Sequence, residues 1–131
     1  MRLKNIPLRA RNLIRKHGTT DPWRIAREMK FDVMFLPLPD RVNGMWRRVL
    51  GRKYIVIDDA LDEWQQRAVL CHELGHYLMH RDYASYSMAG RTFFSNTRYE
   101  HEANLFAAEL MTRTGSEHTA DDILRFLTAN S

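Results

Sequence analysis

Two histidines and a glutamate stand in the middle of the sequence with the spacing of a metal site. His72-Glu73-Leu74-Gly75-His76 has the form H-E-x-x-H and lies within a pattern that predicts a helix. Residues i and i+4 of a helix share one face, so the imidazoles of His72 and His76 can bind one zinc ion. Glu73 can then act as general base on a water beside that ion. The motif predicts a zinc-dependent hydrolase, and a pair of structural core histidines is the alternative.

A catalytic zinc site needs a third protein ligand. His80 lies one turn beyond His76 but too far along the axis from His72 to share one tetrahedral ion without strain. We therefore expect His80 to support a ligand or to lie at the surface. A metzincin-type extension is disfavoured, because Met79 and Asp82 stand where that class needs glycine and histidine.

A later predicted helix offers Glu100 and Glu102 as the remaining candidates. Glu100 shares its face with small residues that favour close helix packing, whereas the face of Glu102 looks mostly solvated. We favour Glu100 as the ligand and Asn104 as a possible partner of a ligand histidine. Thr97-x-x-Glu100 also fits a capping box, in which Glu100 would only cap its own helix.

Helical and strand-like segments alternate in a way that predicts an α+β fold, with a small, mostly antiparallel sheet packed with about five helices. The helix that carries the H-E-x-x-H motif is apolar on nearly every side and should be buried in the core. We expect one domain over residues 1–131. The expected helices cover 6–17, 22–30, 61–80 and 98–112, with a last helix after Thr119; the expected strands are 33–36, 45–50 and 53–58, and Gly51-Arg52 forms the hairpin turn.

Charge is distributed unevenly along the chain. Residues 1–60 hold 14 Lys and Arg against 6 Asp and Glu, a net +8, and residues 61–131 hold 6 against 10, a net −4. The basic N-terminal segment reads most simply as a solvated helix face. Sequence-specific DNA binding is disfavoured, because residues 33–39 are apolar and contain prolines where a recognition helix would follow. No apolar run long enough for a membrane span or signal peptide is present, so we expect a cytoplasmic location.

Three segments, in this order along the chain, closely resemble the ImmA/IrrE family of metallopeptidases: Tyr54–Asp58, His72–His80 and Glu100–Leu110. The resemblance runs from about residue 12 to 112. It implies a zincin-like fold, a gluzincin-like zinc site made by His72, His76 and Glu100, and a catalytic Glu73. It also implies that the substrate is a helix-turn-helix repressor encoded beside the protein in a prophage or mobile element, whose cleavage derepresses its operon.

Two functions follow as hypotheses. The first is a zinc endopeptidase that cuts such a repressor; the strand 53–58 would align an extended substrate by strand addition. The second is a binding module that captures the repressor without cutting it, with a structural or vestigial metal. The second oxyanion donor, the physiological metal and the oligomeric state stay open. The candidate donors are Tyr77, Tyr83, Tyr86, Tyr99 and His80.

Cys71 and three histidines outside the motif are expected to have no chemical role. Cys71 adjoins His72, but one residue along a helix turns the side chain by about 100°, so its thiol should be buried and inert. His17, His101 and His118 have no evident partners and are expected at the surface.

Overall fold

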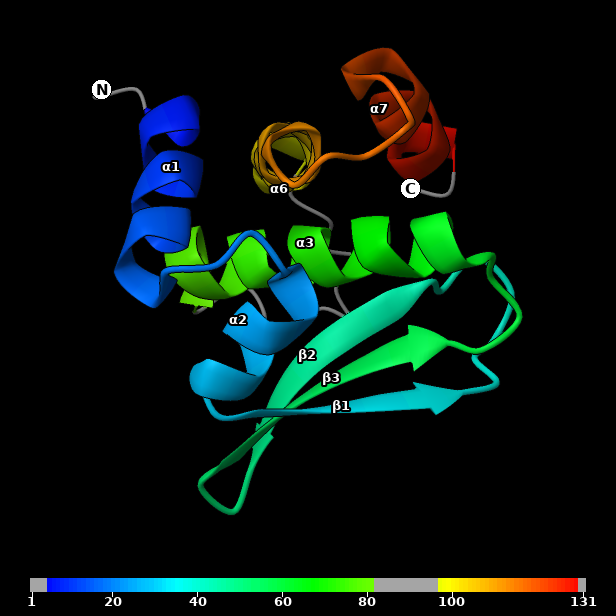
Figure 1. Ribbon diagram of the computed structural model, residues 1–131. Coiled ribbons are helices and arrows are strands. Elements are labelled where there is room, and N and C mark those ends of the chain that lie inside the picture. Colours follow the sequence, from blue (N-terminus) through cyan, green and yellow to red (C-terminus); the bar gives the residue numbers. More distant parts are fainter. Residues whose placement is uncertain (1–4, 82–96, 130–131) are drawn as a thin grey trace.

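A central helix lies between a small sheet and a second group of helices (Figure 1). The computed structural model describes residues 5–81 and 97–129. The central helix is α3 (Glu63–Met79); α6 (Thr97–Arg113) crosses it on the side away from the sheet. The predicted α+β fold with about five helices and a small sheet is confirmed, and so is the burial of the H-E-x-x-H helix.

Capping residues mark the ends of several helices. α1 (Ile6–His17) starts after Asn5, whose side chain accepts from the Leu8 N–H, and ends at Gly18 in the left-handed conformation. α2 spans Pro22–Glu28 and α7 spans Ala120–Ala129. α3 is capped by Asp62 and Gln65 and begins two residues later than the predicted helix 61–80, because the chain turns at 59–61 before the helix begins.

The sheet is mixed and has the order β1-β3-β2. β1 (Phe31–Leu36) pairs in parallel with β3 (Arg52–Asp58), and β2 (Gly44–Val49) pairs with β3 in antiparallel fashion. β3 is therefore the central strand, with both edges bonded. The prediction that residues 53–58 align a substrate by strand addition is wrong, because that mode needs an open strand edge.

The β2–β3 hairpin turns one residue earlier than predicted. Val49 pairs with Arg52, so the two-residue loop is Leu50-Gly51, and both residues have positive φ (52° and 79°). This conformation matches the right-handed strand twist and normally selects Asn-Gly. Leu50 is 100% exposed, so no packing compensates its unfavourable backbone conformation.

β1 is less buried than its apolar sequence predicts. Met34, Phe35 and Leu36 are each more than a third exposed, because β1 lies at the edge of the sheet, away from α3. Trp23 of α2 covers part of this surface, with its ring centroid 5.7 Å from that of Phe35.

Small residues allow the layers to approach one another at two places. A Cβ on Gly44 would clash with the Val69 side chain and lie 2.9 Å from the Val56 carbonyl oxygen, so glycine sets the distance between β2 and α3. A Cβ on Gly75 would lie 3.0 Å from Cδ2 of Phe106, so glycine also sets the distance between α3 and α6. None of the described helices is long and apolar enough to cross a bilayer.

Candidate metal centre

Side chains from α3 and α6 converge to form a compact cluster of possible metal ligands. Nε2 of His72 lies 3.2 Å from Oε1 of Glu100, and Nε2 of His76 lies 2.9 Å from Oε2 of the same carboxylate. One ligand atom of each residue lies within 4.8 Å of those of the other two. Because both oxygens of Glu100 face the imidazoles, its carboxylate is directed at this cluster rather than at its own helix terminus.

The close packing of α3 on α6 explains why these groups meet. His72 and His76 are one turn apart on the face of α3 that carries Gly75, and Phe106 fills the space that a larger residue at 75 would take. Ala103 and Ala107 of α6 are fully buried, as expected for the helix face that also carries Glu100. The inference from small residues to close helix packing is thus confirmed.

The electrostatics of the cluster keep Glu100 anionic and His76 neutral at neutral pH. Burial raises the pKa of Glu100, but its hydrogen bonds and charge interactions with His72 and His76 outweigh this and hold the pKa far below its usual value. Burial lowers the pKa of His76 to about 4, against the raising effect of its hydrogen bond to Glu100. A neutral imidazole and an anionic carboxylate are the protonation states that metal ligands require.

Glu73 lies beside the cluster. Its Oε2 atom is 4.0 Å from Nε2 of His72, and the residue is buried. The carboxylate is thus within the distance that one water molecule can bridge. This position suits a group that exchanges a proton with a water held near His72 and His76.

A second layer of hydrogen bonds stands behind His76. Nδ1 of His76 is 3.0 Å from Nδ1 of His80, and Nε2 of His80 is 2.7 Å from Oε1 of Glu102. The Tyr99 ring stacks on the His80 ring at a centroid distance of 4.1 Å. These contacts tie the metal helix to α6 a second time.

The solvated position predicted for Glu102 is therefore wrong. Glu102 is only 9% exposed, because its carboxylate is hydrogen-bonded to the buried His80. Phe106, one turn further along the same face of α6, is also buried. The sequence left open whether His80 supports a ligand or lies at the surface; in the structure it is buried and contacts His76. We expected Asn104 to hydrogen-bond to a ligand histidine, but the residue that contacts His76 in this way is His80. The Oδ1 atom of Asn104 is buried and accepts no hydrogen bond within the described residues.

Among the other candidates for an oxyanion donor, Tyr77 lies away from the cluster. The hydroxyl of Tyr77 accepts from Nζ of Lys53 at 3.2 Å, on the side of α3 that faces the sheet. Burial raises the pKa of Tyr77, but this hydrogen bond and the charges of nearby cations lower the pKa by more, so the net shift is downward. Tyr83 and Tyr86 lie outside the described residues.

Cys71 and the other histidines have structural environments. The thiol of Cys71 is fully buried, as predicted. Burial raises its pKa to about 12, which disfavours the reactive thiolate. His101 is exposed, as predicted. His17 and His118 are not simple surface residues: His17 bonds to Glu28 at 2.9 Å, and His118 stacks on Trp64 at 4.0 Å.

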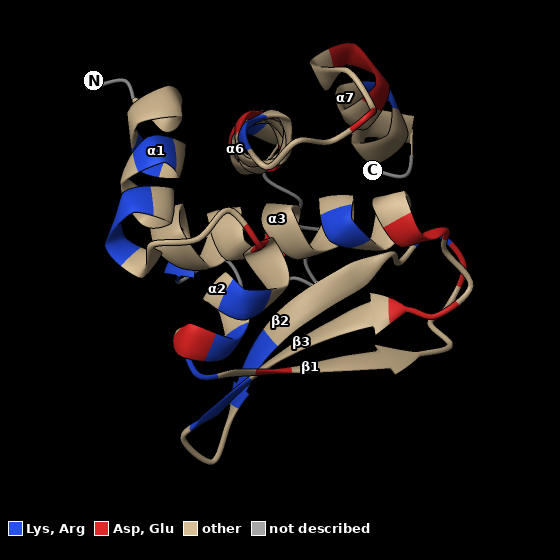
Figure 2. Cartoon of the chain, viewed as in Figure 1, with Lys and Arg blue, Asp and Glu red and all other residues tan. Residues whose placement is uncertain are grey.

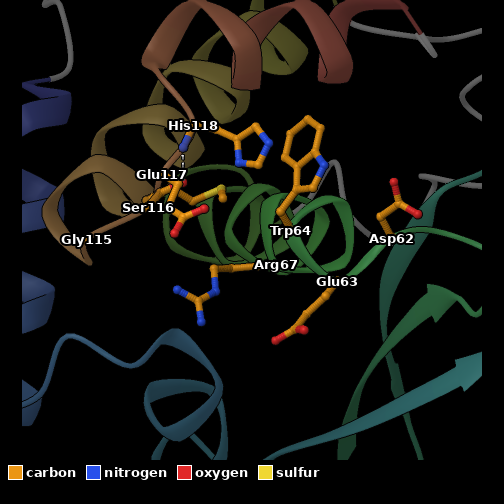
Figure 3. A pocket seen from close by; sticks show the side chains of 9 residues that line it. Asp62, Glu63, Trp64, Arg67, Gly115, Ser116, Glu117 and His118 are labelled. Carbon is orange, nitrogen blue, oxygen red and sulfur yellow. Dashed lines mark hydrogen bonds between the residues drawn. The ribbon is translucent and has the colours of Figure 1, made fainter.

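A cavity of about 600 Å³ lies apart from the cluster, between the first turns of α3 and the connection from α6 to α7 (Figure 3). Glu63, Arg67 and Glu117 bring charges of both signs to its wall, and Trp64 stacks on His118 beside them. None of the three clustered ligand residues lines this cavity.

An H-E-x-x-H helix packed between a small sheet and a helix that supplies a carboxylate is an arrangement typical of metallopeptidases. In agreement, residues 26–121 match the model of the M78 peptidases, described as the IrrE N-terminal-like domain. The chain belongs to this metallopeptidase family, and the resemblance to ImmA/IrrE proteins is confirmed.

Two relatives match most of the chain. It is 35% identical over 118 residues to "Uncharacterized immunity region protein 2" of Bacillus phage phi105, which covers 85% of this chain and 75% of the relative. It is 27% identical over 108 residues to "Metallopeptidase ImmA" of Bacillus subtilis (strain 168). That match covers 82% of this chain but 63% of the relative, so the chain spans less than two thirds of the length of that protein.

Proposed function

We propose that this protein is a zinc-dependent endopeptidase that cleaves a helix-turn-helix transcriptional repressor. The observation that carries the proposal is the convergence of His72, His76 and Glu100 from two helices on one point. Membership of a metallopeptidase family supports a hydrolytic role for this cluster.

The donor set of the cluster fits zinc. Two imidazole nitrogens and one carboxylate oxygen form a set that catalytic zinc sites use, and they leave a coordination position for water or substrate. In this proposal His72, His76 and Glu100 hold the ion. When bound, zinc would supply Lewis-acid activation of a water molecule and stabilise negative charge on the carbonyl oxygen of the substrate.

Glu73 is the proposed catalytic residue. Its carboxylate accepts the proton of the attacking water and later returns it to the leaving amine. Burial beside His72 holds the carboxylate in position and limits access of bulk water, which strengthens its electrostatic interactions with the reacting groups.

His80 and Glu102 are proposed to orient His76. In the metal-loaded site, where Nε2 of His76 would face the ion in place of its hydrogen bond to Glu100, His76 would carry its proton on Nδ1. It would donate a hydrogen bond to Nδ1 of His80, and Nε2 of His80 would donate one to Glu102. This tautomer leaves the Nε2 lone pair of His76 on the side of Glu100, as a metal ligand requires. The role of His80 and Glu102 is thus to position a ligand rather than to react.

The substrate class is inferred from the relatives. One relative is named as a protein of a phage immunity region and the other as a metallopeptidase. The resemblance to the ImmA/IrrE family implies a helix-turn-helix repressor as the substrate. A repressor encoded beside this protein is therefore the expected substrate, and its cleavage would derepress the operon.

Coexpression of the protein with that repressor tests the proposal. Wild type should produce two repressor fragments, and Glu73→Gln should leave the repressor intact while retaining the metal. Release of intact repressor from its operator by both proteins would instead show a non-cleaving binding module, and would contradict the peptidase.

A further inference from the structure

A group of cations gathers where the metal helix ends beside the β2–β3 hairpin. Arg48 on β2 is the register partner of Lys53 on β3, and Arg81 follows the cap residue of α3. Nζ of Lys53 lies 4.5 Å and Cζ of Arg81 lies 4.4 Å from the centroid of the Tyr77 ring. In Figure 2 the hairpin end of β2 and β3 is correspondingly blue.

No acidic side chain of the described residues lies within ion-pair distance of these cations. The ion pairs there include none of Arg47, Arg48, Lys53 and Arg81. Like charges directly opposite on neighbouring strands are destabilising, so the Arg48–Lys53 pair costs stability in the isolated protein. An anionic ligand would reverse this cost.

A cavity of about 210 Å³ opens among these cations. We call it the cation pocket; it is lined by Trp46, Arg47, Arg48 and Arg81. All four side chains are hydrogen-bond donors and none is an acceptor. The Nε1 atom of Trp46 and the Nε atom of Arg47 are buried and have no hydrogen-bond partner within the described residues. Buried donors without partners indicate a missing acceptor, and an anion is an acceptor that suits guanidinium groups.

The size and surroundings of the cation pocket favour a carboxylate from a polypeptide over nucleic acid. Its volume is below the roughly 300 Å³ of typical small-molecule sites and suits a single anionic group. Proteins that bind single strands present exposed aromatic rings for base stacking. Here Phe31, Trp46 and Tyr77 pack edge-to-face on one another, and each is less than 10% exposed.

The cation pocket is linked to the candidate metal centre through the end of α3. Arg81 directly follows His80, which bonds to His76, and the Nε of Arg81 donates to the Tyr77 carbonyl at 3.2 Å. We infer that the cation pocket binds an aspartate or glutamate side chain of the polypeptide substrate and so positions the substrate relative to the metal centre. This inference rests on the proposed peptidase function.

Nuclear magnetic resonance of the full-length Glu73→Gln protein can test this, because the indole N–H signals of Trp23, Trp46 and Trp64 report on separate places. The probes are a short acetylated peptide with two adjacent glutamates, its glutamine counterpart, inorganic phosphate and a short DNA duplex. The glutamate peptide should shift the Trp46 signal alone, and the glutamine peptide should shift none. Trp46→Phe assigns the signal.

Substitutions separate a defined pocket from general charge attraction. Arg48→Gln and Arg81→Gln should each weaken binding of the glutamate peptide about tenfold, through loss of a charge-assisted hydrogen bond. Arg52→Gln removes the same charge from the exposed hairpin tip, outside the cation pocket, and should leave the affinity nearly unchanged.

Several results would overturn the inference. They are an unmoved Trp46 signal with the glutamate peptide, an equal loss of affinity in Arg52→Gln, or a response to phosphate or to the DNA duplex that exceeds the response to the peptide. The peptide assay requires neither metal nor cleavage. A protein without zinc that still shows the Trp46 shift would refute the proposed peptidase but not the anion-binding pocket.

Discussion

Replacement of Gly75 by alanine should weaken the metal site without direct contact to the metal. A Cβ at this position would lie 3.0 Å from Cδ2 of Phe106 and 3.3 Å from its Cβ and Cγ. Comfortable carbon contacts are about 3.5–4.0 Å, so α3 and α6 must separate locally by about 0.5 Å. That displacement lies between the two helices that supply His72, His76 and Glu100.

The expected magnitude is a balance of two effects on the free energy of unfolding. Alanine is favoured over glycine within a helix by about 1 kcal/mol, whereas overpacking of a core costs about 1–3 kcal/mol. The metal-free variant should therefore be destabilised by up to about 2 kcal/mol. If about 1.4 kcal/mol of strain returns when zinc draws the helices together, the Kd for zinc rises about tenfold.

Urea unfolding of the metal-free protein and zinc titration against a competing chelator measure both quantities. Phe106→Leu provides the control, because a smaller side chain makes room for the new Cβ. Combined with Gly75→Ala, it should lose less stability than the sum of the single changes. A Gly75→Ala protein that is about 1 kcal/mol more stable than wild type and binds zinc equally well would refute the argument.

Three further changes test other parts of the structure. Glu102→Gln should weaken zinc binding about 10–100-fold by loosening His80, whereas Glu109→Gln on the same helix should not, as chelator competition will show. Leu50→Asn should raise the free energy of unfolding by about 1 kcal/mol, since asparagine tolerates positive φ; unchanged urea stability would contradict this. Gly44→Ala should lower the free energy of unfolding by about 1–3 kcal/mol, because the new Cβ would clash with the Val69 side chain. If this clash is the cause, Val69→Ala in the same chain should recover part of the loss.

The helices and the three converging residues could be predicted because their signals are local. Gly18, Asp21 and Thr119 act over a few residues, and the i, i+4 spacing of a helix places two imidazoles on one face whatever the rest of the chain does. The small residues that follow Glu100 in its helix likewise indicated which face would approach α3.

The sheet order and the position of Glu102 depend on longer-range packing. Parallel pairing of β1 with β3 joins segments separated by the whole of β2, which no local pattern records, so the central place of β3 and the exposure of β1 were missed. Glu102 looked solvated because its face also carries Glu109. Its burial requires His80 as a partner, and the only signal was a third histidine one turn beyond the motif.

The most direct test of the proposed metal centre is the metal content of the purified protein. Elemental analysis should find about one zinc per chain in the wild type, and sharply less in His76→Ala and Glu100→Ala, while Glu102→Ala retains part of it through the intact ligand set. Circular dichroism of each variant verifies that the fold is kept. A wild-type protein that holds no metal after zinc is supplied and the excess removed would contradict the proposed site and the peptidase mechanism built on it.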